Sequence, residues 1–228
     1  MRRRPLPPAT PTPVPFSPAA ARAHRAGLGL TPGQVAEGMA AHGVRLLPGH
    51  VLGWENGELR PSEEEFVALA RALWCPPAQL MGAAPATLRD FRVAREYTQE
   101  QAAQRLGLSL AAYAKAETIG RWSGDEEQTH TLAHVLGIGL RSLVRVTGRQ
   151  DEFEQCLRSS IDGRWQAQLG PLARLVPAPR SALTAVLTAL QSEYQVPLSW
   201  GTPAAAPTTP LPDRFWQLLA GHDTDIPV

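Results

Sequence analysis

The chain of 228 residues contains little cysteine, few aromatic side chains and a single lysine. Its two cysteines, Cys75 and Cys156, cannot build a disulfide framework or a four-thiolate zinc site. No apolar run approaches the roughly 18 residues that a membrane-spanning helix needs. The basic start, Met1-Arg2-Arg3-Arg4, leads into a proline-rich stretch instead of the apolar region of a secretory signal. We therefore expect a cytoplasmic protein.

An excess of charge of either sign is also absent. The chain has 22 basic and 21 acidic side chains, which gives a formal net charge of +1. Domains that bind nucleic acids are usually more basic than this, so the composition alone does not select such a partner. With 43% hydrophobic and 19% charged residues, the composition is that of a globular protein, and the length allows one or two domains with buried cores.

Proline-rich segments mark the borders between parts of the chain. Residues 1–18 contain seven prolines and few large apolar side chains, so we expect a disordered tail there. A Pro/Ala/Thr stretch at residues 201–210 is typical of a linker. Together with the repeat described next, these borders predict one domain at residues 19–82, a second at 87–148, and a C-terminal extension at 150–228.

An internal repeat is the most informative feature of the sequence. Arg25 and Thr31 recur 67 residues later as Arg92 and Thr98. Further matches follow at spacings of 62 to 63 residues: Glu55 with Glu117, Leu69-Ala70 with Leu132-Ala133, and Leu80 with Leu143. The repeat therefore predicts two tandem units of roughly 65 residues each.

Each unit contains the start and stop signals of short helices. Capping boxes are predicted at three places: Thr31–Gln34, Ser62–Glu65 and Thr98–Gln101. Gly107 is expected to end one helix, and Ser109 to cap the next. A helix, a glycine turn and a second helix are the signature of the helix-turn-helix motif. The sequence therefore predicts an all-α protein.

Two groups of residues resemble a known family. The second unit carries the run from Tyr97 to Ser109, followed by Tyr113 and Glu117. The first unit carries Trp54-Glu55-Asn56-Gly57 and then Arg60-Pro61-Ser62. These motifs resemble the XRE/Cro type of helix-turn-helix regulator, which has the lambda-repressor fold, over about residues 20–148. The resemblance implies two tandem five-helix domains and a transcriptional regulator whose third helices enter the major groove of double-stranded DNA.

The resemblance also implies a pair of structural ion pairs. Arg25 and Arg92 match the arginine that pairs with a glutamate after the recognition helix, here Glu55 and Glu117. Each pair would clamp the first helix of its domain to the third. Removing one partner would leave a poorly solvated charge unpaired.

The DNA contacts implied by the resemblance lie mainly in the second unit. Gln99 and Ser109 would hold phosphates, whereas Tyr113 and Ala116 would face the core. The residues expected to meet bases are Leu110, Ala111 and Lys115. The candidate contacts in the first unit are Arg45, His50 and Asn56.

Two functions remain open at this stage because the expected reading faces are unusually apolar. Leu110 and Ala111 cannot form the bidentate hydrogen bonds by which Gln, Arg or Asn read base edges, although alanine can pack on a thymine methyl. In the first interpretation, the chain is a covalent pseudo-dimer that binds DNA as a transcriptional regulator. In the second, one or both copies use the same fold to bind a protein, such as an RNA polymerase component or another regulator.

The C-terminal extension is predicted to be helical. Phe153, Leu157, Ile161, Trp165 and Leu169 recur every four residues, which predicts one long amphipathic helix interrupted near Gly170-Pro171. A second helix is expected around residues 183–194, and a third after Asp213 as its N-cap. These helices would either pack on the repeat or form the surface for a homodimer or a protein partner.

No constellation of catalytic residues is present. His130 and His134 could share one helix face, but the sequence offers no evident third ligand, so a plain helix surface is favoured over a metal site. The phosphate-binding loop and the nucleophile elbow of hydrolases are both missing. We therefore expect neither an enzyme nor a bound cofactor.

Overall fold

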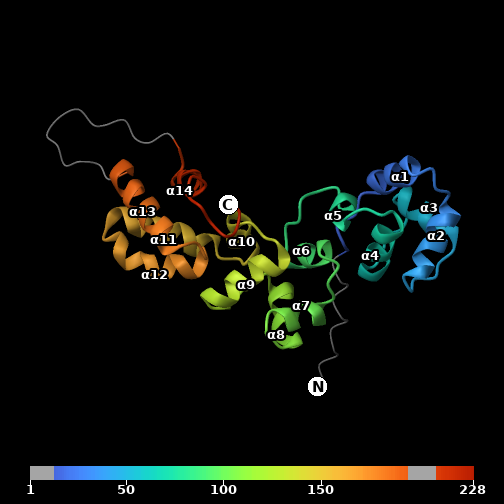
Figure 1. The fold of residues 1–228 in the computed structure, drawn as a ribbon, viewed down its shortest axis with the longest axis horizontal. Helices are drawn as coiled ribbons and strands as arrows, with labels where there is room; N and C mark the ends of the chain where they lie inside the picture. The colour runs from blue at the N-terminus through green and yellow to red at the C-terminus, as the bar shows by residue number, and fades with distance from the viewer. Residues whose placement is uncertain (1–12, 195–208) are drawn as a thin grey trace, which may run out of the picture. The chain divides into compact units, whose positions relative to one another are not determined.

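The computed structural model describes residues 13–194 and 209–228. Across these two ranges the chain forms fourteen α-helices and no strand, which confirms the all-α prediction (Figure 1). None of the helices described is long and apolar enough to cross a bilayer. Of the predicted linker at residues 201–210, all but Thr209 and Pro210 lies outside the described residues.

The chain divides into two compact units. Unit 1 comprises residues 1–85 together with 93–96, and unit 2 comprises residues 86–92 together with 97–228. The main division falls between Pro85 and Ala86, in the gap between the predicted domains at residues 19–82 and 87–148.

Unit 1 is built from short helices that begin at prolines or at capping side chains. Thr31 and Ser62 form capping boxes with Gln34 and Glu65, as predicted. The helices are α1 (Pro18–Gly27), α2 (Pro32–Ala41), α3 (Pro48–Glu55), α4 (Glu63–Ala72) and α5 (Pro77–Leu80). Their apolar faces enclose a core that includes Met39, Trp54, Phe66 and Leu69.

The predicted disordered tail at residues 1–18 extends too far toward the C-terminus. Val14 and Phe16 are buried in the core of unit 1, and the Phe16 ring meets Phe66 edge-on. The amide of Ser17 donates to the carbonyl of Leu80, and Pro18 already begins α1. Two large apolar side chains among the prolines are enough to anchor this short segment. Residues 1–12 lie outside the described residues.

Unit 2 opens with another series of five helices. They are α6 (Leu88–Ala94), whose last residues belong to unit 1, α7 (Gln99–Arg105), α8 (Leu110–Ile119), α9 (Glu126–Leu136) and α10 (Leu140–Val146). The predicted capping box of Thr98 and Gln101 is confirmed. Gly107 adopts a φ of +65° just after α7, which confirms it as the residue that stops this helix.

The helices of the C-terminal extension differ from the prediction at three points. They are α11 (Gln150–Asp162), α12 (Trp165–Leu175), α13 (Arg180–Tyr194) and α14 (Leu211–Leu219). The expected single long helix is wrong, because Gly163 leaves the helical conformation and divides the apolar stripe. Pro171, expected to interrupt the helix, lies inside α12. Asp213 is not the N-cap of α14, because the helix starts earlier, after Pro210.

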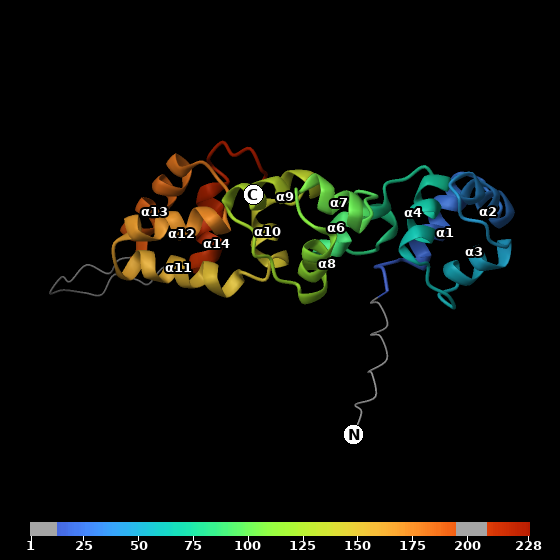
Figure 2. The ribbon, with the colours of Figure 1, turned by 90° about the horizontal axis from the view of Figure 1, so that it is seen from below.

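The extension shares one hydrophobic core with the helices before it. Helices α11 to α14 pack together in both views, and α9 contacts α12 (Figures 1 and 2). Within this core Phe153 stacks on Trp216, and Phe215 meets both of these rings edge-on. Among the described residues of 150–228, only Val228 is a large apolar side chain left exposed. The predicted border between residues 87–148 and 150–228 therefore does not separate two hydrophobic cores. The apolar stripes of the extension pack inside unit 2, which is the first of the two expected arrangements.

Candidate nucleic-acid interface

A buried arginine–glutamate pair joins α6 to α8 in unit 2. The Nε atom of Arg92 donates to Oε1 of Glu117 at 2.6 Å, and its Nη2 donates to Oε2 at 3.1 Å. A third donor of the same guanidinium, Nη1, reaches the carbonyl of Tyr97 at 2.9 Å. The Arg92 side chain is 1% exposed and that of Glu117 is 4% exposed. This two-pronged contact fixes the rotation of α8 about its own axis.

Unit 1 contains the same arrangement between α1 and α3. Nε and Nη2 of Arg25 donate to the two carboxylate oxygens of Glu55 at 2.6 and 2.7 Å, and Nη1 donates to the carbonyl of Leu30 at 2.9 Å. The accepting carbonyl lies five residues after the arginine in both units. This pair is more open to solvent, with Arg25 17% exposed. The hydrogen bonds to Glu55, together with the charge of this carboxylate, raise the pKa of Arg25.

The pinned helix α8 presents one face to the core and the other to solvent. Tyr113 is fully buried, as is most of Ala116, and burial together with the charge of Glu117 raises the pKa of the Tyr113 hydroxyl. Leu110, Ala111 and Lys115 lie on the exposed side. The outward face of α8 therefore combines apolar side chains with one cation.

The two expected phosphate contacts of the second copy lie in different surroundings. Ser109 is exposed, and its Oγ accepts from the amide of Ala112 as the N-cap of α8, which leaves the hydroxyl proton available to a ligand. Gln99 is half-buried, and its Nε2 donates to Oε2 of Glu117 at 2.8 Å. The structure thus directs this amide to the Arg92–Glu117 pair instead of to solvent.

The candidates of unit 1 form a looser group. Arg45, in the connection between α2 and α3, and His50, in the first turn of α3, are both exposed. Asn56 is exposed but accepts from Nη2 of Arg22 through its Oδ1 at 2.9 Å. Beside them Leu47 is 71% exposed and Leu52 is 45% exposed, so this face also carries exposed apolar side chains.

The loop after α8 is held by the junction between α10 and α11. The amide of Trp122 donates to the carbonyl of Thr147 at 3.0 Å. A Cβ on Gly148 would lie 2.4 Å from the carbonyl oxygen of Gly120, so only glycine allows this approach. The contacts bring Arg121, directly after the end of α8, close to Arg149 at the start of α11.

Sequence reasoning missed the arginines that gather beside this loop and the capping box that follows it. Asp125 and Gln128 form a reciprocal capping box at the start of α9. The spacing Asp125-x-x-Gln128 was a readable signal for that box. The gathering of arginines had no such signal, because it depends on a contact between segments that are far apart in the sequence.

The described residues offer no group of three side chains suited to a metal ion. His130 and His134 do share a face of α9, with their Nε2 atoms 3.3 Å apart. In comparisons with known proteins, no family model, no curated protein and no solved structure matched the chain.

Proposed function

We propose that the chain is a DNA-binding regulator of the XRE/Cro helix-turn-helix type, with two tandem domains that each present a third helix to the major groove. The observation that carries the proposal is the same two-pronged arginine–glutamate contact in both units. It holds α3 and α8 in the same way and leaves one face of each helix uncovered. A helix held rigidly with a free outer face is what major-groove reading requires.

The strongest set of DNA contacts lies on unit 2. Ser109 and Lys115 supply a hydroxyl donor and a cation, and Leu110 and Ala111 offer apolar surface that suits thymine methyl groups. Gln99 acts in this proposal mainly by holding Glu117, and Arg45, His50 and Asn56 of unit 1 are auxiliary contacts.

Reversing the charge of Lys115 tests the proposal. With Lys115→Glu, binding of the full chain to duplex DNA should weaken at least roughly tenfold, because the one cation on the reading face becomes a repulsive acid. Fluorescence anisotropy at several salt concentrations measures the effect. For the unchanged chain, log K should fall linearly with log salt as counterions are released.

Arg164→Glu is the matched control for this experiment. It makes the same charge change at an exposed residue in the connection between α11 and α12. Equal losses of DNA affinity for both variants would show that net charge alone determines binding. Unchanged binding with Lys115→Glu would show that α8 does not have the proposed role.

A second candidate function is recognition of a protein partner through unit 1. Leu47 and Leu52 are exposed at α3, and Leu59, just after this helix, is 46% exposed. Three exposed leucines around one short helix are typical of a protein-binding surface. Absence of DNA binding at low salt, together with a flat salt response, would favour this candidate.

A further inference from the structure

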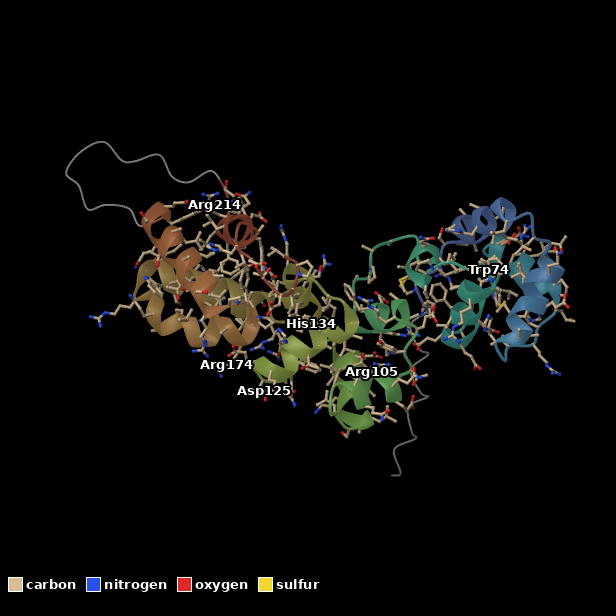
Figure 3. The ribbon with its side chains drawn as sticks, in the orientation of Figure 1. Trp74, Arg105, Asp125, His134, Arg174 and Arg214 are labelled. Carbon is tan, nitrogen blue, oxygen red and sulfur yellow. The ribbon has the colours of Figure 1, made fainter. Side chains whose placement is uncertain are left out.

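Three arginines gather around a shallow cavity beside the end of α8. The cavity has a volume of about 430 Å³ and lies entirely in unit 2. Arg121 comes from the loop after α8, Arg149 from the start of α11, and Arg174 from the last turn of α12. The acids on its wall are Asp125 and Glu152. Figure 3 shows Arg174 and Asp125 beside each other at the start of α9.

The acids and Arg149 are already engaged in contacts of the fold. Asp125 accepts from the amide of Gln128 as the cap of α9. Arg149 donates through Nε and Nη2 to Glu152 and through Nη1 to the carbonyl of Arg174 at 3.0 Å. Arg149 therefore ties the end of α12 to the start of α11 and has little left to offer a ligand.

Arg121 and Arg174 are in the opposite situation. Both are exposed, and in the described part of the chain neither guanidinium makes a hydrogen bond or an ion pair. Their charges nevertheless act at the cavity, because they help Arg149 to hold the pKa of Glu152 below its usual range. The two arginines thus offer planar guanidinium groups with unused donors at one cavity. Such groups suit a phosphate, because each of them can contact it through two N–H groups.

We infer that Arg121 and Arg174 form a phosphate-binding site, and that its ligand is a phosphodiester of the DNA backbone beside the groove in which α8 lies. The inference rests on the proposed function. Arg121 follows Gly120, the residue that ends α8, and the loop is fixed against Thr147 and Gly148. A phosphate in this cavity therefore lies next to the end of the reading helix. Through Arg174, the C-terminal extension contributes directly to DNA binding.

The test neutralises each arginine and measures how DNA binding depends on salt. Arg121→Gln and Arg174→Gln should each weaken binding about tenfold at low salt, equally on duplexes of different sequence. Each should also reduce the slope of log K against log salt by about 1, as expected for one lost phosphate contact. The fold should persist, because Arg149 bonds the backbone carbonyl of Arg174 and not its side chain. Arg164→Gln is the matched control, with no expected change in slope.

A titration of the full chain with inorganic phosphate separates the two sources of such a ligand. Weak or absent binding of phosphate, combined with the reduced slopes, supports the backbone assignment. Saturable phosphate binding that Arg121→Gln and Arg174→Gln abolish, with unchanged DNA slopes, overturns that assignment in favour of a free phosphate ligand. No effect in either experiment overturns the site. If the unchanged chain does not bind DNA, the proposed function fails, and the phosphate titration still decides whether the cavity binds an anion.

Discussion

Replacing Arg92 by alanine is expected to lower the free energy of unfolding of unit 2 by about 3–5 kcal/mol. The substitution leaves the Glu117 carboxylate, 4% exposed, without its guanidinium partner, and it also removes the donor to the Tyr97 carbonyl. The carboxylate keeps the hydrogen bond from the amide of Gln99, which carries no charge. Chemical denaturation followed by circular dichroism measures the loss.

The same substitution in unit 1 provides an internal comparison. Arg25→Ala removes the equivalent contact, but Glu55 keeps Arg22 with its Nε 4.0 Å from the carboxylate, and the pair is more open to water. We expect a loss of roughly half the size. Equal losses of stability in the two units would show that burial of the ion pair does not determine its contribution to stability.

A double variant distinguishes an unpaired charge from lost packing. Arg92→Met combined with Glu117→Leu removes both charges and keeps apolar volume, so it should be more stable than Arg92→Ala alone. If the ion pair stabilises the fold only by keeping the two buried charges balanced, α8 should keep its position in this double variant. A double variant that is less stable than Arg92→Ala would show instead that the hydrogen bonds themselves supply the stability.

The second large effect is expected for Phe153→Ala in α11. Phe153 is fully buried, and its ring contacts Phe215 and Trp216 of α14 at centroid distances of 5.1 and 5.0 Å. Loss of a buried aromatic ring usually costs about 3–5 kcal/mol, because the cavity left behind closes only in part. The midpoint of unfolding in urea should fall accordingly.

Trp74→Ala serves as the control for this measurement. Trp74 lies in unit 1 and is 88% exposed, so removing its larger ring should change stability by no more than about 0.5 kcal/mol. A small effect of Phe153→Ala would mean that the contact between α11 and α14 contributes little to stability. It would also mean that residues 150–228 and α6 to α10 do not form one cooperative unit.

Local chemistry was sufficient to predict much of the fold. A threonine or serine followed three residues later by glutamine or glutamate satisfies orphan amides at any helix start, so the three predicted capping boxes could be identified from the sequence. Gly107 followed from the same kind of argument, because a left-handed residue after a helix is usually glycine. The repeat showed that these arginines and glutamates recur in both copies, and the resemblance to the XRE/Cro type implied that they pair.

Other features depended on contacts between distant segments. The apolar period of residues 153–169 continues across Gly163, so periodicity could not reveal that the chain turns there and that α12 packs back on α11. The choice of Gln99 to bond Glu117 instead of solvent depends on how α7 and α8 pack. In the same way, Arg121 and Arg174 are 53 positions apart in the chain and line one cavity only after folding.

The sequence by itself determined the helical class of this protein, its repeat and the capping boxes of three helices, and the family resemblance added the side chains of the two ion pairs. Only the tertiary structure decided which side chains remain available to a ligand and that the extension belongs to the core of unit 2. The physical reason is that capping and periodicity act within a few residues, whereas burial and charge clustering depend on segments that meet only when the chain has folded.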